Sequence, residues 1–132
     1  MDLKLELQDR ILVAEFTGPL TLHEAVKVCT LACDGAAERD CTAILFDASA
    51  VNGELSLFEN YELGKSVAEY CVAHGWSYKV AAVGKLGVTG FPALVASNRG
   101  LQVECFDDRE KAMEWLSAFT RGSSRARGNS ES

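Results

Sequence analysis

The sequence predicts one α/β domain in which a mixed β-sheet is packed by about four helices. Two continuous apolar runs, residues 43–46 and 80–83, lack polar alternation, which is typical of central parallel strands covered on both faces. Segments with helical periodicity separate the predicted strands, and such an order implies parallel crossovers. A chain of 132 residues suits one domain, and we expect that domain to span residues 1–120.

An antiparallel hairpin is expected to open the sheet. Leu3, Leu5 and Leu7 alternate with polar residues, as they do in a half-buried strand. A second run rich in β-formers follows at residues 11–17, after a short turn, and the pair predicts a hairpin. Gly18-Pro19 is expected to end the sheet there.

The first helix is predicted to begin at Thr21. Glu24, three residues later, completes a capping-box pattern, and apolar residues recur at helical spacing to about Ala37. After the buried strand at residues 43–46, we expect residues 47–53 to form a loop.

The second helix is predicted from about Ser56 to Ala73. Ser56 with Glu59 repeats the pattern of a capped start. Gly75 follows the helix, where glycine suits the left-handed conformation of a C-cap.

The rest of the chain is predicted to hold a glycine-rich turn at residues 84–89, a short helix at 91–98 and a last strand at 103–106. Asp107 or Asp108 should cap a final helix carrying Ala112, Met113, Trp115 and Leu116. Gly, Ser and Arg dominate residues 121–132, which predicts a flexible tail.

The charge balance argues against two classes of partner. Net charge is −6, and the predicted tail carries three arginines and one glutamate, so the body carries −8. An acidic body opposes binding to nucleic-acid phosphates and to anionic membranes. No apolar run is long enough for membrane insertion, and the start of the sequence lacks a signal-peptide pattern, so we expect a cytoplasmic protein.

Five cysteines lie in apolar segments: Cys29, Cys33, Cys41, Cys71 and Cys105. The odd count suits a reducing compartment. Cys29 and Cys33 share one face of the first helix, where free cysteine usually packs as a small hydrophobe. No further ligands have the spacing of a zinc site, so we expect no metal and no cofactor.

Three stretches resemble the SpoIIAA-like, STAS-type domain family. They are Ile44-Leu45-Phe46-Asp47-Ala48-Ser49, Lys79-Val80-Ala81-Ala82-Val83-Gly84, and residues 103–116 with their Phe106-Asp107 step and Trp115-Leu116 pair. The resemblance covers roughly residues 3–118. It implies a SpoIIAA-like mixed sheet, and its packing residues specify fold better than function.

The resemblance also implies a kind of function. STAS domains are regulatory modules, some of which bind an anti-sigma kinase and are switched by phosphorylation of a serine at the start of the helix after the third strand. Ser56 lies near that place, although Gly53-Glu54-Leu55-Ser56 departs from the family's Asp-Ser-Ser-Gly motif. The fold is also similar to that of lipid-binding Sec14-type domains.

We predict a working surface around the loops that lead from strands to helices, because ligands of open α/β sheets favour that edge. It comprises Asp47, Ser49, Ser56, Phe58, Lys85, Thr89 and Phe91. Each has a plainer alternative: Ser56 as an N-cap rather than a phosphorylation site, Asp47 as a turn residue, the Lys85 loop as a simple glycine turn, and the aromatics as core rather than groove.

The predicted function is therefore a non-enzymatic regulatory or protein-interaction module with a protein partner. The first alternative is a domain that binds a small apolar ligand or lipid. The second alternative is an enzyme of unknown class, although no convergent catalytic groups are recognisable in the sequence. If the chain self-associates, base rates favour a two-fold homodimer.

Overall fold

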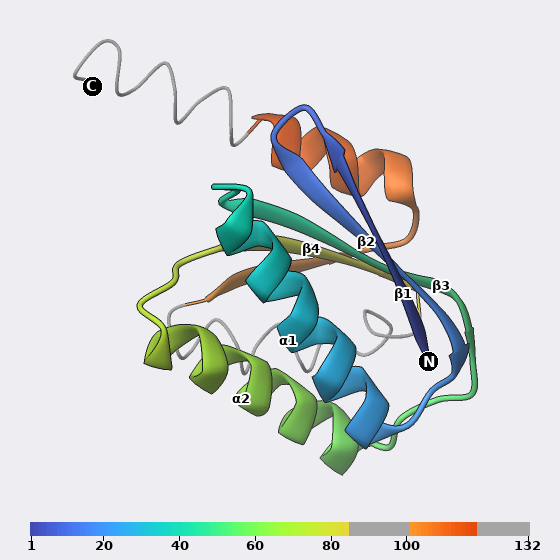
Figure 1. The fold of residues 1–132 in the computed structure, drawn as a ribbon. Helices are drawn as coiled ribbons and strands as arrows, with labels where there is room; N and C mark the ends of the chain where they lie inside the picture. Colours follow the sequence, from blue (N-terminus) through green and yellow to red (C-terminus); the bar gives the residue numbers. More distant parts are fainter. Residues whose placement is uncertain (85–100, 119–132) are drawn as a thin grey trace, which may run out of the picture.

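The computed structural model describes residues 1–84 and 101–118. Its strands are β1 (Asp2–Gln8), β2 (Ile11–Pro19), β3 (Ala43–Asn52), β4 (Lys79–Gly84) and β5 (Gln102–Phe106). Its helices are α1 (Leu22–Glu38), α2 (Leu57–Ala73) and a C-terminal segment at residues 109–118 (Figure 1).

The five strands form one sheet in the order β1-β2-β3-β4-β5. β1 pairs antiparallel with β2, and every later pair is parallel, so the predicted mixed sheet with its N-terminal hairpin is confirmed. The hairpin turns at Asp9 and Arg10, both with positive φ, a turn geometry that matches the twist of the strands.

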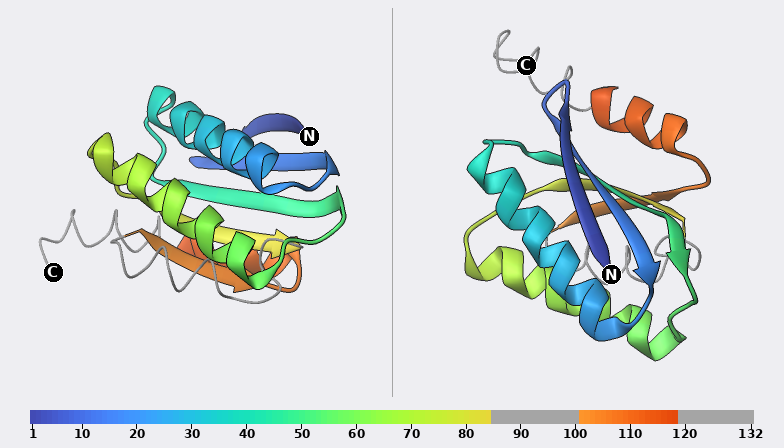
Figure 2. Two further views of the ribbon diagram at one scale, coloured as in Figure 1. Left: turned by 90° about the horizontal axis from the view of Figure 1, so that it is seen from below. Right: turned by 45° about the vertical axis from the view of Figure 1, so that its right-hand side comes forward.

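Helices cover both faces of the sheet. α1 and α2 lie side by side on one face, and the C-terminal helix lies on the other (Figures 1 and 2). β3 alternates between the two cores: Ile44 and Phe46 pack toward α1 and α2, whereas Ala43 and Leu45 pack toward the C-terminal helix. This double burial is why the run at residues 43–46 shows no polar alternation.

Two strand ends were predicted too early. β2 does not stop at Gly18-Pro19 but continues through Pro19, and residues 47–53 are not a loop, because β3 continues to Asn52. Gly18 pairs with Val51, and Pro19 pairs with Asn52. Pro19 lies beyond the residues that β2 pairs with β1, so no strand faces it on that side and its missing N–H is tolerated. Val51 still packs in the core shared with α1 and α2, so that face of β3 remains covered.

The helices begin where the sequence predicted, but the described residues contain fewer helices than predicted. Thr21 and Ser56 are the N-caps of α1 and α2, and the Asp108 carboxylate accepts the backbone N–H of Lys111 at the start of the last helix. The described residues hold three helices rather than about four. The predicted helix at 91–98, the turn after Gly84 and the tail at 121–132 lie outside the described residues.

β3 has a bulge next to the point where its pairing with β4 ends. Glu15 of β2 faces Asp47, yet Thr17 faces Ala50, so Phe16 spans two residues of β3. β4 ends beside this bulge at Gly84, which has φ +88°. A Cβ at Gly84 would lie 2.6 Å from the Ala48 carbonyl carbon and from the Ser49 nitrogen, so only glycine fits against the bulged backbone.

We therefore expect Gly84→Ala to be far more destabilising than Gly75→Ala. Gly75 also has positive φ, but a Cβ there meets nothing within 4 Å. The Gly75 variant should lose about 1 kcal/mol from backbone strain alone, and the Gly84 variant at least ~2 kcal/mol more because backbone atoms must move. Urea unfolding of both variants measures the difference, and equal losses would refute the close approach.

Candidate functional site

Ser56 is held in a complete capping box at the start of α2. Its Oγ accepts the backbone N–H of Glu59 at 3.1 Å, and the Glu59 carboxylate accepts the backbone N–H of Ser56 at 3.0 Å. Buried Asn60 donates from Nδ2 to the carbonyls of Ser56 and Leu55. The capping interpretation of Ser56 is thus confirmed, and the first turn of α2 is held in one conformation.

Two adjacent apolar side chains stand exposed on this first turn. Leu57 is 65% exposed and Phe58 is 69% exposed, so neither packs in the core. The preceding residues Asn52, Gly53 and Glu54 are also exposed. Two adjacent large apolar side chains left in solvent are a candidate contact for a partner.

Asp47 and Ser49 belong to a second feature, in the bulge of β3. The Asp47 Oδ1 accepts both the backbone N–H of Ser49 at 3.0 Å and its hydroxyl at 2.6 Å. Asp47 therefore bonds its own backbone, as the plainer alternative proposed, although it does so within a strand. Ser49 is exposed, and the Asp47 side chain is 12% exposed.

Arg109 ties this bulge to the C-terminal helix. Its guanidinium lies 2.6 Å from the Glu15 carboxylate and 3.3 Å from the Asp47 Oδ2. The hydrogen bond to Glu15 is the main cause that raises the pKa of Arg109, with the charge of Asp47 adding to it. One cation is therefore shared by two carboxylates, and these ion pairs link the C-terminal helix to β2 and β3.

The predicted surface is thus only partly assembled by the described residues. Asp47 and Ser49 lie together in β3, and Ser56 and Phe58 lie together on α2. Lys85, Thr89 and Phe91 lie outside the described residues. Sequence reasoning missed Glu15 and Arg109; the signal was a single charged residue interrupting the apolar run of β2, which needs a partner when it faces a packed helix.

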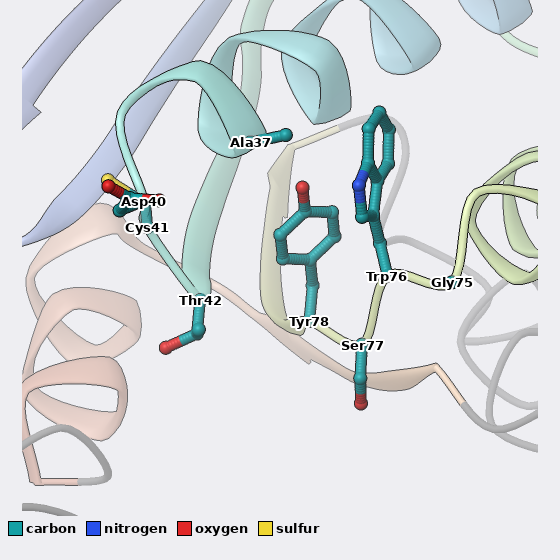
Figure 3. A pocket seen from close by; sticks show the side chains of 8 residues that line it. All are labelled: Ala37, Asp40, Cys41, Thr42, Gly75, Trp76, Ser77 and Tyr78. Atoms are coloured by element: carbon teal, nitrogen blue, oxygen red, sulfur yellow. The ribbon is translucent and has the colours of Figure 1, made fainter.

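A pocket lies at the opposite edge of the sheet, where β3 and β4 begin. Its volume is about 310 Å³, and it opens to solvent. Figure 3 shows Tyr78 and Trp76 side by side within it, with Ala37, Asp40 and Cys41 across from them. Trp76 stacks on His74 at 4.5 Å between ring centroids.

Matching helix ends shape this pocket. Cys41 donates its backbone N–H to Ala36, and Trp76 donates its own to Cys71. In both α1 and α2 this bond closes the helix end around a residue with positive φ, Asp40 in one and Gly75 in the other. The prediction that Gly75 closes α2 is confirmed.

None of the helices in residues 1–84 and 101–118 is both long and apolar enough to cross a bilayer. Within the same ranges, no three His, Cys, Asp or Glu side chains are grouped so that they could hold a metal ion.

We expect Ser56→Ala to lower the free energy of unfolding by about 1 kcal/mol, because the first turn of α2 loses its cap. Ser56→Asp should stay near the wild type, since aspartate caps equally well and its charge suits a helix N-terminus. Urea unfolding of the three proteins checks this. A Ser56→Asp variant as unstable as Ser56→Ala would contradict the capping role.

We also expect Arg109 and Glu15 to be energetically coupled. A double-mutant cycle with Arg109→Met and Glu15→Gln should give roughly 0.5–1 kcal/mol, decreasing at high salt because both groups are partly exposed. The control is the exposed pair Arg39–Glu38, whose atoms are 3.6 Å apart and whose coupling should be near zero. Equal coupling energies in the two cycles would contradict the docking role of Arg109.

Comparison with known proteins identifies the fold. No family model matches the chain, and no curated protein matches it. A variant of RsbS from Moorella thermoacetica superposes with a TM-score of 0.58 at 13% identity, over 92% of this chain and 99% of that one. An uncharacterised DUF3478-family protein with a SpoIIAA-like fold from Shewanella loihica superposes with a TM-score of 0.53 at 24% identity, over 87% of this chain and 92% of that one. The chain therefore has the SpoIIAA-like fold of STAS-type domains, as its motifs predicted.

Proposed function

We propose that this protein is a non-enzymatic regulatory module that binds a protein partner through the start of α2. The observation that carries the proposal is the exposed pair Leu57 and Phe58, which directly follows the N-cap residue Ser56. The SpoIIAA-like fold supports it, because the STAS domains that the sequence resembles act by binding proteins.

The energetics favour a small, rigid contact. Burying a leucine or phenylalanine side chain against a partner stabilises a complex by roughly 1.5–3 kcal/mol each. The capping box and Asn60 fix the backbone beneath the pair, so little ordering entropy opposes binding.

The charged groups support a binding role over a catalytic one. Asp47 and Glu15, which lie at the edge where α/β enzymes place their sites, share the Arg109 guanidinium. Their carboxylates are used to dock the C-terminal helix. The acidic net charge of −6 favours a partner with a basic or neutral surface over nucleic acid.

We expect a photoreactive benzoylphenylalanine at position 58, introduced in the source cells, to cross-link to one specific protein. Val72 is the matched control position, because it lies on the same helix and is 60% exposed but near the opposite end. The cross-linked protein, identified by mass spectrometry, is then purified and titrated calorimetrically. Leu57→Ala or Phe58→Ala should weaken binding at least about tenfold, and Val72→Ala should leave it within about twofold.

A partner that cross-links equally well from position 72, or whose affinity survives both Leu57→Ala and Phe58→Ala, would refute this surface as the binding site. Thermal unfolding of each variant confirms that the fold is intact, which is expected because all three side chains are exposed.

A further inference from the structure

Three cysteines lie buried between the two helices that cover one face of the sheet. Cys29 and Cys33 belong to α1, and Cys71 belongs to α2; none is more than 1% exposed. All three are free thiols, and they pack in the core as the sequence predicted. The structure adds a contact that the sequence could not show: the Sγ atoms of Cys33 and Cys71 are 3.5 Å apart.

The surrounding contacts hold this pair in register. The Tyr70 hydroxyl, one residue before Cys71, donates to the Asp34 carboxylate, one residue after Cys33, at 2.7 Å. A disulfide bond is about 2.0 Å long, so the two sulfurs, now 3.5 Å apart, need to approach by about 1.5 Å. Side-chain rotation and a small movement between the two helices would supply this shift.

The two thiols of the pair differ in acidity. The pKa of Cys71 is lowered because the Cys33 thiol can donate a hydrogen bond to its thiolate. The pKa of Cys33 is raised by the same hydrogen bond and by burial. Burial raises the pKa of the third thiol, Cys29, to about 12. Because the thiolate is the reactive form, the lowered pKa favours Cys71 as the attacking thiol of the pair.

Two residues that line the pocket are hydrogen-bonded to the backbone of the pair. The Tyr78 hydroxyl donates to the Cys33 carbonyl at 2.9 Å, and the Trp76 backbone N–H donates to the Cys71 carbonyl at 2.9 Å. Tyr78 and Trp76 both line the pocket (Figure 3). For hydrogen peroxide to reach the buried sulfurs from this side, the wall must open locally.

We propose that Cys33 and Cys71 are a redox-modification site, at which a hydroperoxide converts the two thiols into a disulfide that joins α1 to α2. The Cys71 thiolate attacks one peroxide oxygen, breaks the O–O bond and becomes a sulfenic acid while hydroxide leaves and takes up a proton. The Cys33 sulfur then attacks the Cys71 sulfur, the S–S bond forms, and water leaves. Two thiols and one hydrogen peroxide thus give one disulfide and two waters.

The disulfide would change the pocket as well as the helix pair. Moving the two sulfurs together pulls on the Cys33 and Cys71 backbones, to which Tyr78 and Trp76 are hydrogen-bonded. The oxidation state of the pair is thereby transmitted to the pocket at the amino edge of the sheet. This inference is independent of partner binding at the start of α2, which lies at the other end of that helix.

The test uses the reduced full-length protein, treated with hydrogen peroxide at neutral pH without denaturant and then alkylated. Before alkylation, the expected product is a monomer about 2 Da lighter than the reduced protein. After alkylation, it carries two alkyl groups fewer than the reduced protein, and a non-reducing tryptic digest joins residues 28–39 to residues 66–79. Fragmentation of the wild-type peptide must place the bond at Cys33 rather than Cys29. Dithiothreitol should reverse the bond, and the oxidised form should unfold roughly 5 °C or more above the reduced form.

Variants supply the matched controls. Cys29→Ser and Cys41→Ser should still form the bond, whereas Cys71→Ser should not. A bond to Cys29, Cys41 or Cys105, a link between two chains, or a bond that forms only in urea would overturn the proposal. Because the wild-type digest locates the bond by itself, the result stands even if one of the buried variants fails to fold.

Discussion

The double burial of β3 is the constraint on which the rest of this structure depends. Ile44 and Phe46 pack into one core, and Ala43 and Leu45 into the other. A strand with both faces covered carries apolar side chains on both of them. Its first polar residue is Asp47, where the strand bulges, Gly84 closes against it, and Arg109 of the last helix contacts the Asp47 carboxylate.

This arrangement separates two edges with different chemistry. Near the carboxyl ends of the strands, the charged groups form ion pairs with one another, and the exposed apolar side chains are those in the first turn of α2. At the amino edge, the closing turns of α1 and α2 leave an open pocket with an aromatic wall. The proposed partner surface and the proposed redox link to the pocket therefore lie at opposite ends of the strands and share no residues.

The helix pair connects the two edges. α2 carries the exposed Leu57 and Phe58 at its first turn and Cys71 in its last turn. A rigid helix of 17 residues transmits a displacement at one end to the other only if its packing on α1 has two arrangements. The thiol pair and the Asp34–Tyr70 hydrogen bond are the contacts that would define such arrangements.

The sequence by itself determined the order of the described elements, the antiparallel hairpin, the two central strands and the caps at Thr21 and Ser56, because each depends on local chemistry or on a periodic pattern. It left Asp107 and Asp108 as alternative caps of the last helix, and the structure shows Asp108 in that role. It also indicated that Cys29 and Cys33 are core residues. The tertiary structure decided the rest. Where β2 and β3 end depends on their pairing with each other, so Gly18, Pro19 and residues 47–52 were misread from local turn propensity. The partnership of Glu15 with Arg109 and that of Cys33 with Cys71 join residues 94 and 38 positions apart, and only the packing of separate elements brings such residues into contact.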